Sequence, residues 1–154
     1  MTPRAVFDCM VFLQAAARPD GPAGACLRQV EEGKVILCIS PPIMAEVRDV
    51  LSRPKTQKKF PLLTTESVEE FVKNVESKAV AIDEVPKAVT FERDLKDEPY
   101  LNLAIATGSQ YLVSRDKDLL DLMNDKEHCE RFPALTILDP VAFLQIMAQA
   151  PNPS

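Results

Sequence analysis

The chain has 154 residues, of which 46% are hydrophobic and 27% charged, a balance typical of one globular domain with its own core. Its formal net charge of −5 argues against a protein that coats nucleic acid by bulk attraction, because phosphate binding rests on Lys and Arg. No segment approaches the roughly 18 apolar residues of a membrane span, and Asp8 interrupts the only stretch resembling a signal peptide. We expect a cytoplasmic protein with a single domain at 1–149 and a disordered tail at 150–154.

The predicted elements alternate between strands and helices along the chain. In order, we expect a strand at residues 6–7, a loop or short helix at 10–17, a helix at 22–31, a strand at 34–40 and a helix ending at Leu51. A basic break at 54–61 is followed by a helix at 66–77, a strand at 79–82 and a loop at 83–94. The last elements are a helix at 98–107, a strand at 111–114, a helix at 116–122, a strand at 135–138 and a helix at 140–149.

This alternation predicts the α/β class. Strands that alternate with helices form right-handed crossovers and a mostly parallel sheet that is covered on both faces. Residues 34–40 form a continuous apolar run rich in β-branched side chains, which is typical of a parallel strand buried on both faces. Ser40 and the two prolines after it are a typical helix start.

Four carboxylates fall where open α/β sheets place their ligands, beyond the carboxyl ends of the strands. Asp8 directly follows the first strand, and Asp116 follows the fourth strand closely. Asp97 precedes a helix and heads its apolar face, while Glu46 lies at the border of the apolar face of another helix. Carboxylates at the edge of a core are costly unless they are paired or bound to metal.

Each of these carboxylates also has a purely structural interpretation. Asp97 and Asp116 are both placed to be N-caps of the helices that follow them, and Glu46 alone is compatible with a surface position. If the four do converge, their mutual repulsion raises their pKa values, and a divalent cation relieves it. Ligation by oxygen alone suits Mg²⁺ or Mn²⁺ better than zinc, and such ions serve phosphodiester hydrolysis.

Three segments resemble the PIN-domain family, in particular small bacterial PIN proteins grouped with toxin–antitoxin ribonucleases. These segments are VFDCMVF near the N-terminus, ISPPIMAEVRDVL, and RDLKDEPYLNLAIATGSQYLVSRDKDLL. The resemblance runs from about Arg4 to about Leu144. It implies a three-layer α/β/α sandwich around a mostly parallel sheet of about five strands. It also implies metal-binding and catalytic roles for Asp8, Glu46, Asp97 and Asp116.

The activity implied by this resemblance is that of a Mg²⁺- or Mn²⁺-dependent endoribonuclease, the toxin of a toxin–antitoxin pair, with RNA as substrate, an antitoxin as partner and a homodimer as the assembly. Family members usually carry Asn two residues after the first Asp, where this chain has Met10. That departure supports an alternative, a catalytically silent PIN domain that binds RNA or protein. A phosphatase or receiver-like domain is a further alternative, but the expected phosphoacceptor Asp and later Lys are not evident.

Several other residues complete the analysis. Asp94, Ser114 and Asp118 are secondary candidates, because they lie near the proposed site in sequence. The basic residues of the break are either a solvated linker or a site for RNA phosphates; they are Arg53, Lys55, Lys58 and Lys59. We assign no catalysis to His128, and we interpret Tyr100 and Tyr111 as packing residues. The four cysteines show no metal or disulfide spacing and are expected to be reduced thiols.

Overall fold

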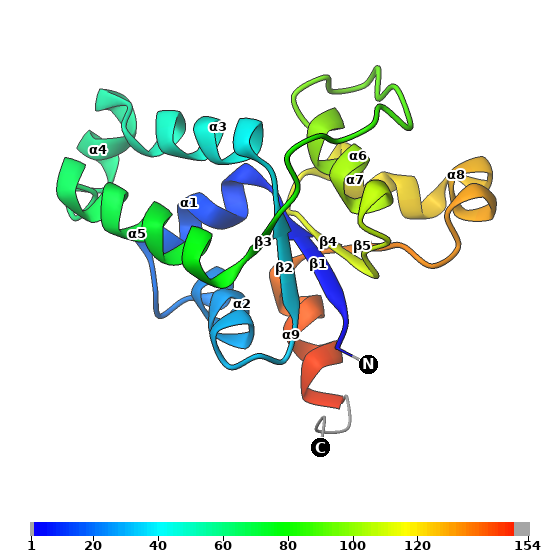
Figure 1. The fold of residues 1–154 in the computed structure, drawn as a ribbon, viewed down its shortest axis with the longest axis horizontal. Helices are drawn as coiled ribbons and strands as arrows, with labels where there is room; N and C mark the ends of the chain where they lie inside the picture. Colours follow the sequence, from blue (N-terminus) through cyan, green and yellow to red (C-terminus); the bar gives the residue numbers. More distant parts are fainter. Residues whose placement is uncertain (1, 150–154) are drawn as a thin grey trace.

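Five short parallel strands form the centre of the fold within residues 2–149, which are the residues that the computed structural model describes (Figure 1). The sheet order is β3-β2-β1-β4-β5. The strands are β1 (Arg4–Phe7), β2 (Ile36–Ile39), β3 (Val80–Ala81), β4 (Tyr111–Val113) and β5 (Thr136–Leu138). The predicted class and the parallel sheet are confirmed. The predicted disordered tail at 150–154 lies outside the described residues.

Helices cover both faces of this sheet (Figure 1). One side carries α1 (Cys9–Ala17), α2 (Pro22–Glu31), α3 (Pro41–Leu51), α4 (Pro54–Lys59) and α5 (Thr65–Lys78). The other side carries α6 (Glu98–Ala106), α7 (Lys117–Leu120), the 3-10 turn η1 (Asp121–Asn124) and α8 (Lys126–Arg131). The final helix, α9 (Pro140–Gln149), packs against α2. None of the described helices combines the length and the apolar character needed to cross a membrane.

The strand order creates a switch point at the centre of the sheet. From β1 the chain passes through α1 and α2 to β2, whereas β4, the other neighbour of β1, is reached through α6 on the opposite face. The carboxyl ends of β1 and β4 therefore lie side by side where the connections diverge. Open parallel sheets bind their ligands at such a crevice.

Aromatic side chains pack the core beneath this switch point. The ring of Phe143 on α9 meets the ring of Phe7 on β1 edge-on, with a centroid distance of 6.2 Å, and the ring of Tyr111 on β4 at 5.5 Å. Phe12 on α1 lies 5.9 Å from Phe7. Edge-to-face aromatic pairs add to the stabilisation from burial alone, so this cluster holds β1 and β4 firmly together.

One prediction of local structure was wrong, and one helix was not predicted. Residues 54–59 form α4 rather than a break, with Pro54 at the first helical position. No residue of α4 is buried, so its sequence lacks the apolar period by which helices are recognised. Residues 126–131 form the unpredicted helix α8, which Asp125 caps by accepting from the amide of His128 at 3.1 Å. The ring of His128 is buried, and burial lowers its pKa.

Gly24 allows α2 to pack closely against the turn before it. A Cβ atom at this position would clash with the carbonyl oxygen and carbonyl carbon of Pro19, which are backbone atoms that no rotamer change can move. The chain therefore needs glycine here for close approach.

We expect Gly24→Ala to lower the free energy of unfolding by about 1–3 kcal/mol, the usual cost of overpacking. At an exposed helical position the same change stabilises by about 1 kcal/mol, so the sign of the effect is diagnostic. Urea denaturation followed by circular dichroism measures it. A variant as stable as the wild type would contradict the tight approach of α2 to Pro19.

Candidate metal centre

Asp8 lies at the carboxyl end of β1, directly beside β4. The pairing of Phe7 with Val113 sets this position, and the Asp8 amide donates to the Val113 carbonyl at 3.1 Å. One carboxylate oxygen of Asp8 caps α1 by accepting from the Val11 amide at 3.0 Å. The other oxygen accepts from the hydroxyl of Ser114. Asp8 is only 3% exposed, so its carboxylate is held rigidly by the sheet and the helix together.

Ser114 links Asp8 to Asp116. Its hydroxyl donates to Asp8 and also accepts from the amide of Asp116 at 2.9 Å. Asp116 caps α7, because its Oδ1 accepts from the amide of Leu119 at 3.2 Å. The capping interpretation of Asp116 is therefore confirmed. Capping uses only the Oδ1 atom of Asp116, so the carboxylate can also belong to a cluster.

Asp97 differs from an ordinary helix cap. It occupies the first position before α6, but its side chain makes no capping hydrogen bond. Its Oδ2 is buried and has no hydrogen-bond partner among the described residues. The interpretation of Asp97 as a plain N-cap was wrong. Because native proteins rarely leave a buried polar atom unsatisfied, this oxygen is a candidate metal ligand.

Three carboxylates meet at this point. One oxygen each from Asp94, Asp97 and Asp116 lies within 4.8 Å of the other two. Asp94 comes from the long loop between β3 and α6, and its Oδ1 accepts from the amide of Lys96 at 2.9 Å. The structure thus brings one secondary candidate, Asp94, into the cluster with two of the four primary candidates.

The protonation behaviour of the cluster reflects this crowding. The pKa of Asp97 rises to about 8, first because burial disfavours the charged form and then because Asp116, Asp94 and Asp8 repel it. The pKa of Asp8 rises to about 6, also chiefly through burial, although its bonds from Ser114 and Val11 oppose the shift. In a metal-free protein, the ionised form of Asp97 therefore destabilises the fold.

Glu46 reaches the same region from α3. It is half-buried, and its Oε1 accepts from the hydroxyl of Tyr100 on α6 at 2.8 Å. The ring of Tyr100 is fully buried, so the prediction that Tyr100 is a packing residue is confirmed. The hydrogen bond from its hydroxyl to Glu46 was not predicted from the sequence. Tyr100 follows Asp97 by three residues on α6, and helical spacing places residues three apart on the same face. That spacing was the available signal.

Asp118 and Met10 stand apart from the cluster. Asp118 pairs with Arg93 at 2.8 Å, and Arg93 also reaches Asp121 at 3.4 Å. The structure therefore engages Asp118 in an ion pair outside the group of three carboxylates. Met10 lies in the first turn of α1 and is 48% exposed. Its thioether provides no N–H or carboxylate with which to support a metal ligand.

The donor set fits a hard divalent cation. The clustered ligand atoms are all carboxylate oxygens, which Mg²⁺ and Mn²⁺ prefer. The thiol of Cys9 lies near Glu46, but burial and the charge of Glu46 raise its pKa to about 12, so it remains protonated. All four cysteines are free, as expected. A cation beside the buried oxygen of Asp97 would relieve the repulsion among these carboxylates.

Comparisons with known proteins identify the fold and the family of the chain. Residues 4–118 match the PIN domain. Among solved structures, PAE2754 from Pyrobaculum aerophilum is similar with a TM-score of 0.60 and 18% identity, covering 97% of this chain and 98% of that chain. VapBC2 from Rickettsia felis, determined bound to a DNA fragment from their promoter, has a TM-score of 0.57 and 15% identity, covering 88% and 98%. At such identities the likeness shows the fold alone. No curated protein matches the chain.

The matched segment contains the whole site. It spans well over half of the chain and includes β1, β4 and the carboxylates of Asp8, Glu46, Asp94, Asp97 and Asp116. The overall fold of this chain is similar to that of the two solved structures. The chain belongs to the PIN-domain family.

Proposed function

We propose that the protein is a metal-dependent endoribonuclease and the toxin component of a toxin–antitoxin pair. The observation that carries the proposal is the buried, partnerless Oδ2 of Asp97, beside the carboxylates of Asp94 and Asp116. Membership of the PIN-domain family supports a nuclease. In this proposal Asp97 and Asp116 hold the metal most directly, with Asp8 and Glu46 completing the site and Asp94 as an additional ligand.

The cation we propose is Mg²⁺ or Mn²⁺. When bound, such an ion activates water, polarises the phosphate and balances the charge that develops during phosphodiester hydrolysis. The protein's own contribution is orientation. Ser114 fixes the carboxylate of Asp8, and Tyr100 fixes that of Glu46. Hydrogen bonds of this kind hold ligand side chains in place and raise metal affinity.

The partners in this proposal are an RNA substrate, an antitoxin and a second copy of the chain, all in the cytoplasm. The resemblance to PIN proteins of toxin–antitoxin systems supports an antitoxin, and so does the similarity to VapBC2. A second candidate function is a catalytically silent PIN domain that binds RNA or protein. The observation that favours it is Met10, which stands where the family usually has Asn.

We expect the wild type to cleave single-stranded RNA with Mn²⁺ or Mg²⁺ and not with EDTA. Asp97→Asn should lower the rate by more than about 100-fold, beyond the loss typical of groups that only support metal ligands. Asp20→Asn, which makes the same change at an exposed turn position, should retain activity. Gel analysis of a mixed RNA pool measures both.

Folded wild-type protein that leaves RNA intact with either metal would favour the silent domain. Met10→Asn then tests whether the silence is caused by Met10 or by some other feature of the protein. Because Met10 is half-exposed, the substitution should be tolerated, and cleavage gained by Met10→Asn would assign the silence to this residue. Cleavage that persists in EDTA or in Asp97→Asn would overturn the proposed site.

The raised pKa of Asp97 predicts how stability depends on pH. Without metal, folded Asp97 is protonated near pH 4 and unfolded Asp97, with a pKa of about 3.9, is only about half ionised, so the two states differ little there. As the pH rises toward about 8, the unfolded state ionises first, so the wild type loses stability relative to Asp97→Asn. We expect Asp97→Asn to melt at a higher temperature than the wild type at pH 8 in EDTA, by about 2–8 °C, and to melt similarly at pH 4.

Thermal melts across this pH range, in EDTA and in Mn²⁺, measure the effect. Mn²⁺ should raise the melting temperature of the wild type, because a ligand that binds only the folded state stabilises it, and should raise that of Asp97→Asn much less. An Asp97→Asn protein that is less stable than the wild type at pH 8 in EDTA would mean that the carboxylate has a stabilising partner.

The bond between Tyr100 and Glu46 predicts a second pair of effects. Tyr100→Phe should lower the free energy of unfolding by about 1 kcal/mol, the usual net value of a hydrogen bond, and weaken the response of the melting temperature to Mn²⁺. Tyr111→Phe is the matched control, since the Tyr111 hydroxyl has no hydrogen bond within residues 2–149 and its ring packs against Phe143. Equal effects of the two variants would argue against a positioning role for Tyr100.

A further inference from the structure

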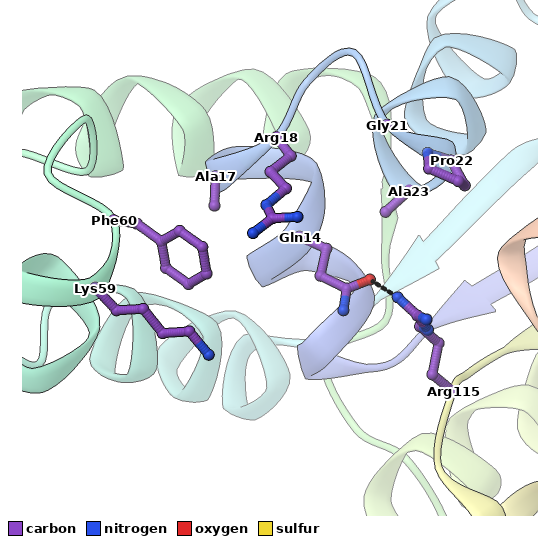
Figure 2. Close-up of a pocket in the computed structure, with 9 residues that line it drawn as sticks. All are labelled: Gln14, Ala17, Arg18, Gly21, Pro22, Ala23, Lys59, Phe60 and Arg115. Carbon is purple, nitrogen blue, oxygen red and sulfur yellow. Dashed lines mark hydrogen bonds between the residues drawn. The ribbon is translucent and has the colours of Figure 1, made fainter.

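A basic pocket lies beside the carboxylate cluster, between α1, α2, α4 and the segment after β4. Its volume is about 240 Å³. Figure 2 shows Lys59 and Phe60 approaching it from one side and Arg115 from the other, with Arg18 above the Phe60 ring. The described lining residues include three cations, Arg18, Lys59 and Arg115, and no carboxylate.

The three cations keep their charge available. Elsewhere in the described chain, Arg48, Arg53 and Arg93 pair with carboxylates, but the ion pairs within residues 2–149 include none of the three pocket cations. Arg115 donates instead to the neutral amide oxygen of Gln14 at 2.9 Å, as the dashed line in Figure 2 shows. In a chain of net charge −5, such a concentration of unpaired positive charge favours an anion.

Phe60 organises two of these cations. The guanidinium carbon of Arg18 lies 5.8 Å from the centroid of the Phe60 ring, and the Nζ of Lys59 lies 5.5 Å from it. Both are within the range of a cation–π interaction, so the half-buried ring gathers the charges without neutralising them. An aromatic ring among cations is also the combination with which proteins bind single-stranded nucleic acid, through stacking and phosphate contacts.

The start of α2 adds to the positive potential. The cap residue Gly21 makes no side-chain capping bond, and the first turn of α2 contains no acidic residue. The unsatisfied amides of a helix N-terminus favour phosphate groups. This end of α2 lines the same pocket as Arg18 and Lys59, so backbone and side chains reinforce one another.

The pocket is connected to the carboxylate cluster by α1 and by the segment after β4. Arg115 lies between Ser114 and Asp116 in the sequence, and the hydroxyl of Ser114 donates to Asp8. On α1, Gln14 lies six residues beyond Asp8, which is about 9 Å along the helix axis at 1.5 Å per residue. A strand whose scissile phosphate lay at the cluster could therefore place a neighbouring phosphate in the pocket.

We propose that the pocket of Arg18, Lys59, Phe60 and Arg115 binds a backbone phosphate of single-stranded RNA next to the cleaved bond. The inference rests on the proposed nuclease function and deepens it. It also divides the basic residues near α4: Lys59 lines the pocket, whereas Arg53 pairs with Asp49 at 2.9 Å. An acidic peptide is the competing occupant, and the test includes it.

The test uses the full chain in EDTA, where the RNA stays intact. It measures binding of a short fluorescent single-stranded RNA and, separately, of a fluorescent acidic peptide, by anisotropy at several salt concentrations. The test variant is Arg18→Gln with Lys59→Gln. The matched control is Lys55→Gln with Lys58→Gln, which removes two cations at exposed positions of α4 that do not line the pocket. Thermal melts verify that both variants fold.

Loss of one phosphate contact on a single strand should reduce the slope of log K against log salt by about 0.7, which weakens binding about fivefold at 0.1 M salt. We expect this loss in the test variant and a much smaller one in the control. Equal losses would indicate diffuse surface attraction and overturn the pocket. An unchanged test variant would overturn it too, as would a wild type that binds an acidic peptide in a pocket-dependent way but no RNA.

Cleavage with Mn²⁺ separates this inference from the proposed function. If the pocket is correct, the test variant should show a raised KM for RNA with kcat largely retained. Wild-type cleavage with unchanged binding and KM in the test variant would leave the nuclease standing and remove the pocket. Pocket-dependent RNA binding without any cleavage would keep the phosphate site and remove the nuclease.

Discussion

The junction of β1 and β4 is the constraint on which the rest of the site depends. Parallel pairing of Phe7 with Val113 brings Asp8 and Ser114 to the same edge of the sheet, where their side chains bond to one another. The aromatic cluster of Phe7, Tyr111 and Phe143 fixes the two strands from below. Since packed cores resist deformation, the position of Asp8 is set by the whole fold and not by a local loop.

Around this rigid centre, the structure tolerates a local conflict. Asp97 has one buried oxygen with no hydrogen-bond partner among the described residues, and its pKa rises first because burial disfavours the charged form and then because neighbouring carboxylates repel it. Natural sequences break the rules of favourable packing mainly at functional sites, and stability elsewhere offsets the cost. The bonds of Ser114 and Tyr100 show how the arrangement is held: hydrogen-bond donors orient individual carboxylates while the cluster itself stays open to a cation.

Charge is distributed in two adjacent zones of opposite sign along α1. The carboxylate cluster lies at the N-terminal end of α1, and the pocket of Arg18, Lys59, Phe60 and Arg115 lies toward its C-terminal end. This separation would let an acidic chain attract a phosphate backbone, since local clefts of one charge focus the field regardless of the net charge. Cation binding at one zone and phosphate binding at the other would be mutually compatible.

The sequence by itself determined the fold class and named candidate acids, two of which, Asp97 and Asp116, the structure brings together with Asp94. Apolar strands alternating with amphipathic helices require a parallel sheet covered on both faces. Acids that follow such strands must then lie at one edge of the sheet, which predicted that Asp8 and Asp116 lie near each other. In the structure, Ser114 links the two. The short polar helix α4 was missed, because none of its residues is buried and helical periodicity arises from burial.

Only the tertiary structure decided which oxygens are free and which charges are paired. In the structure, Asp118 forms an ion pair with Arg93, and the hydroxyl of Tyr100 donates to Glu46. Three separate segments bring Arg18, Lys59 and Arg115 to one pocket. Contacts of this kind depend on side-chain direction and on the distance between elements far apart in sequence. The local sequence pattern determines the hydrophobic periodicity of each element. It does not determine the strand register and packing that bring distant elements together.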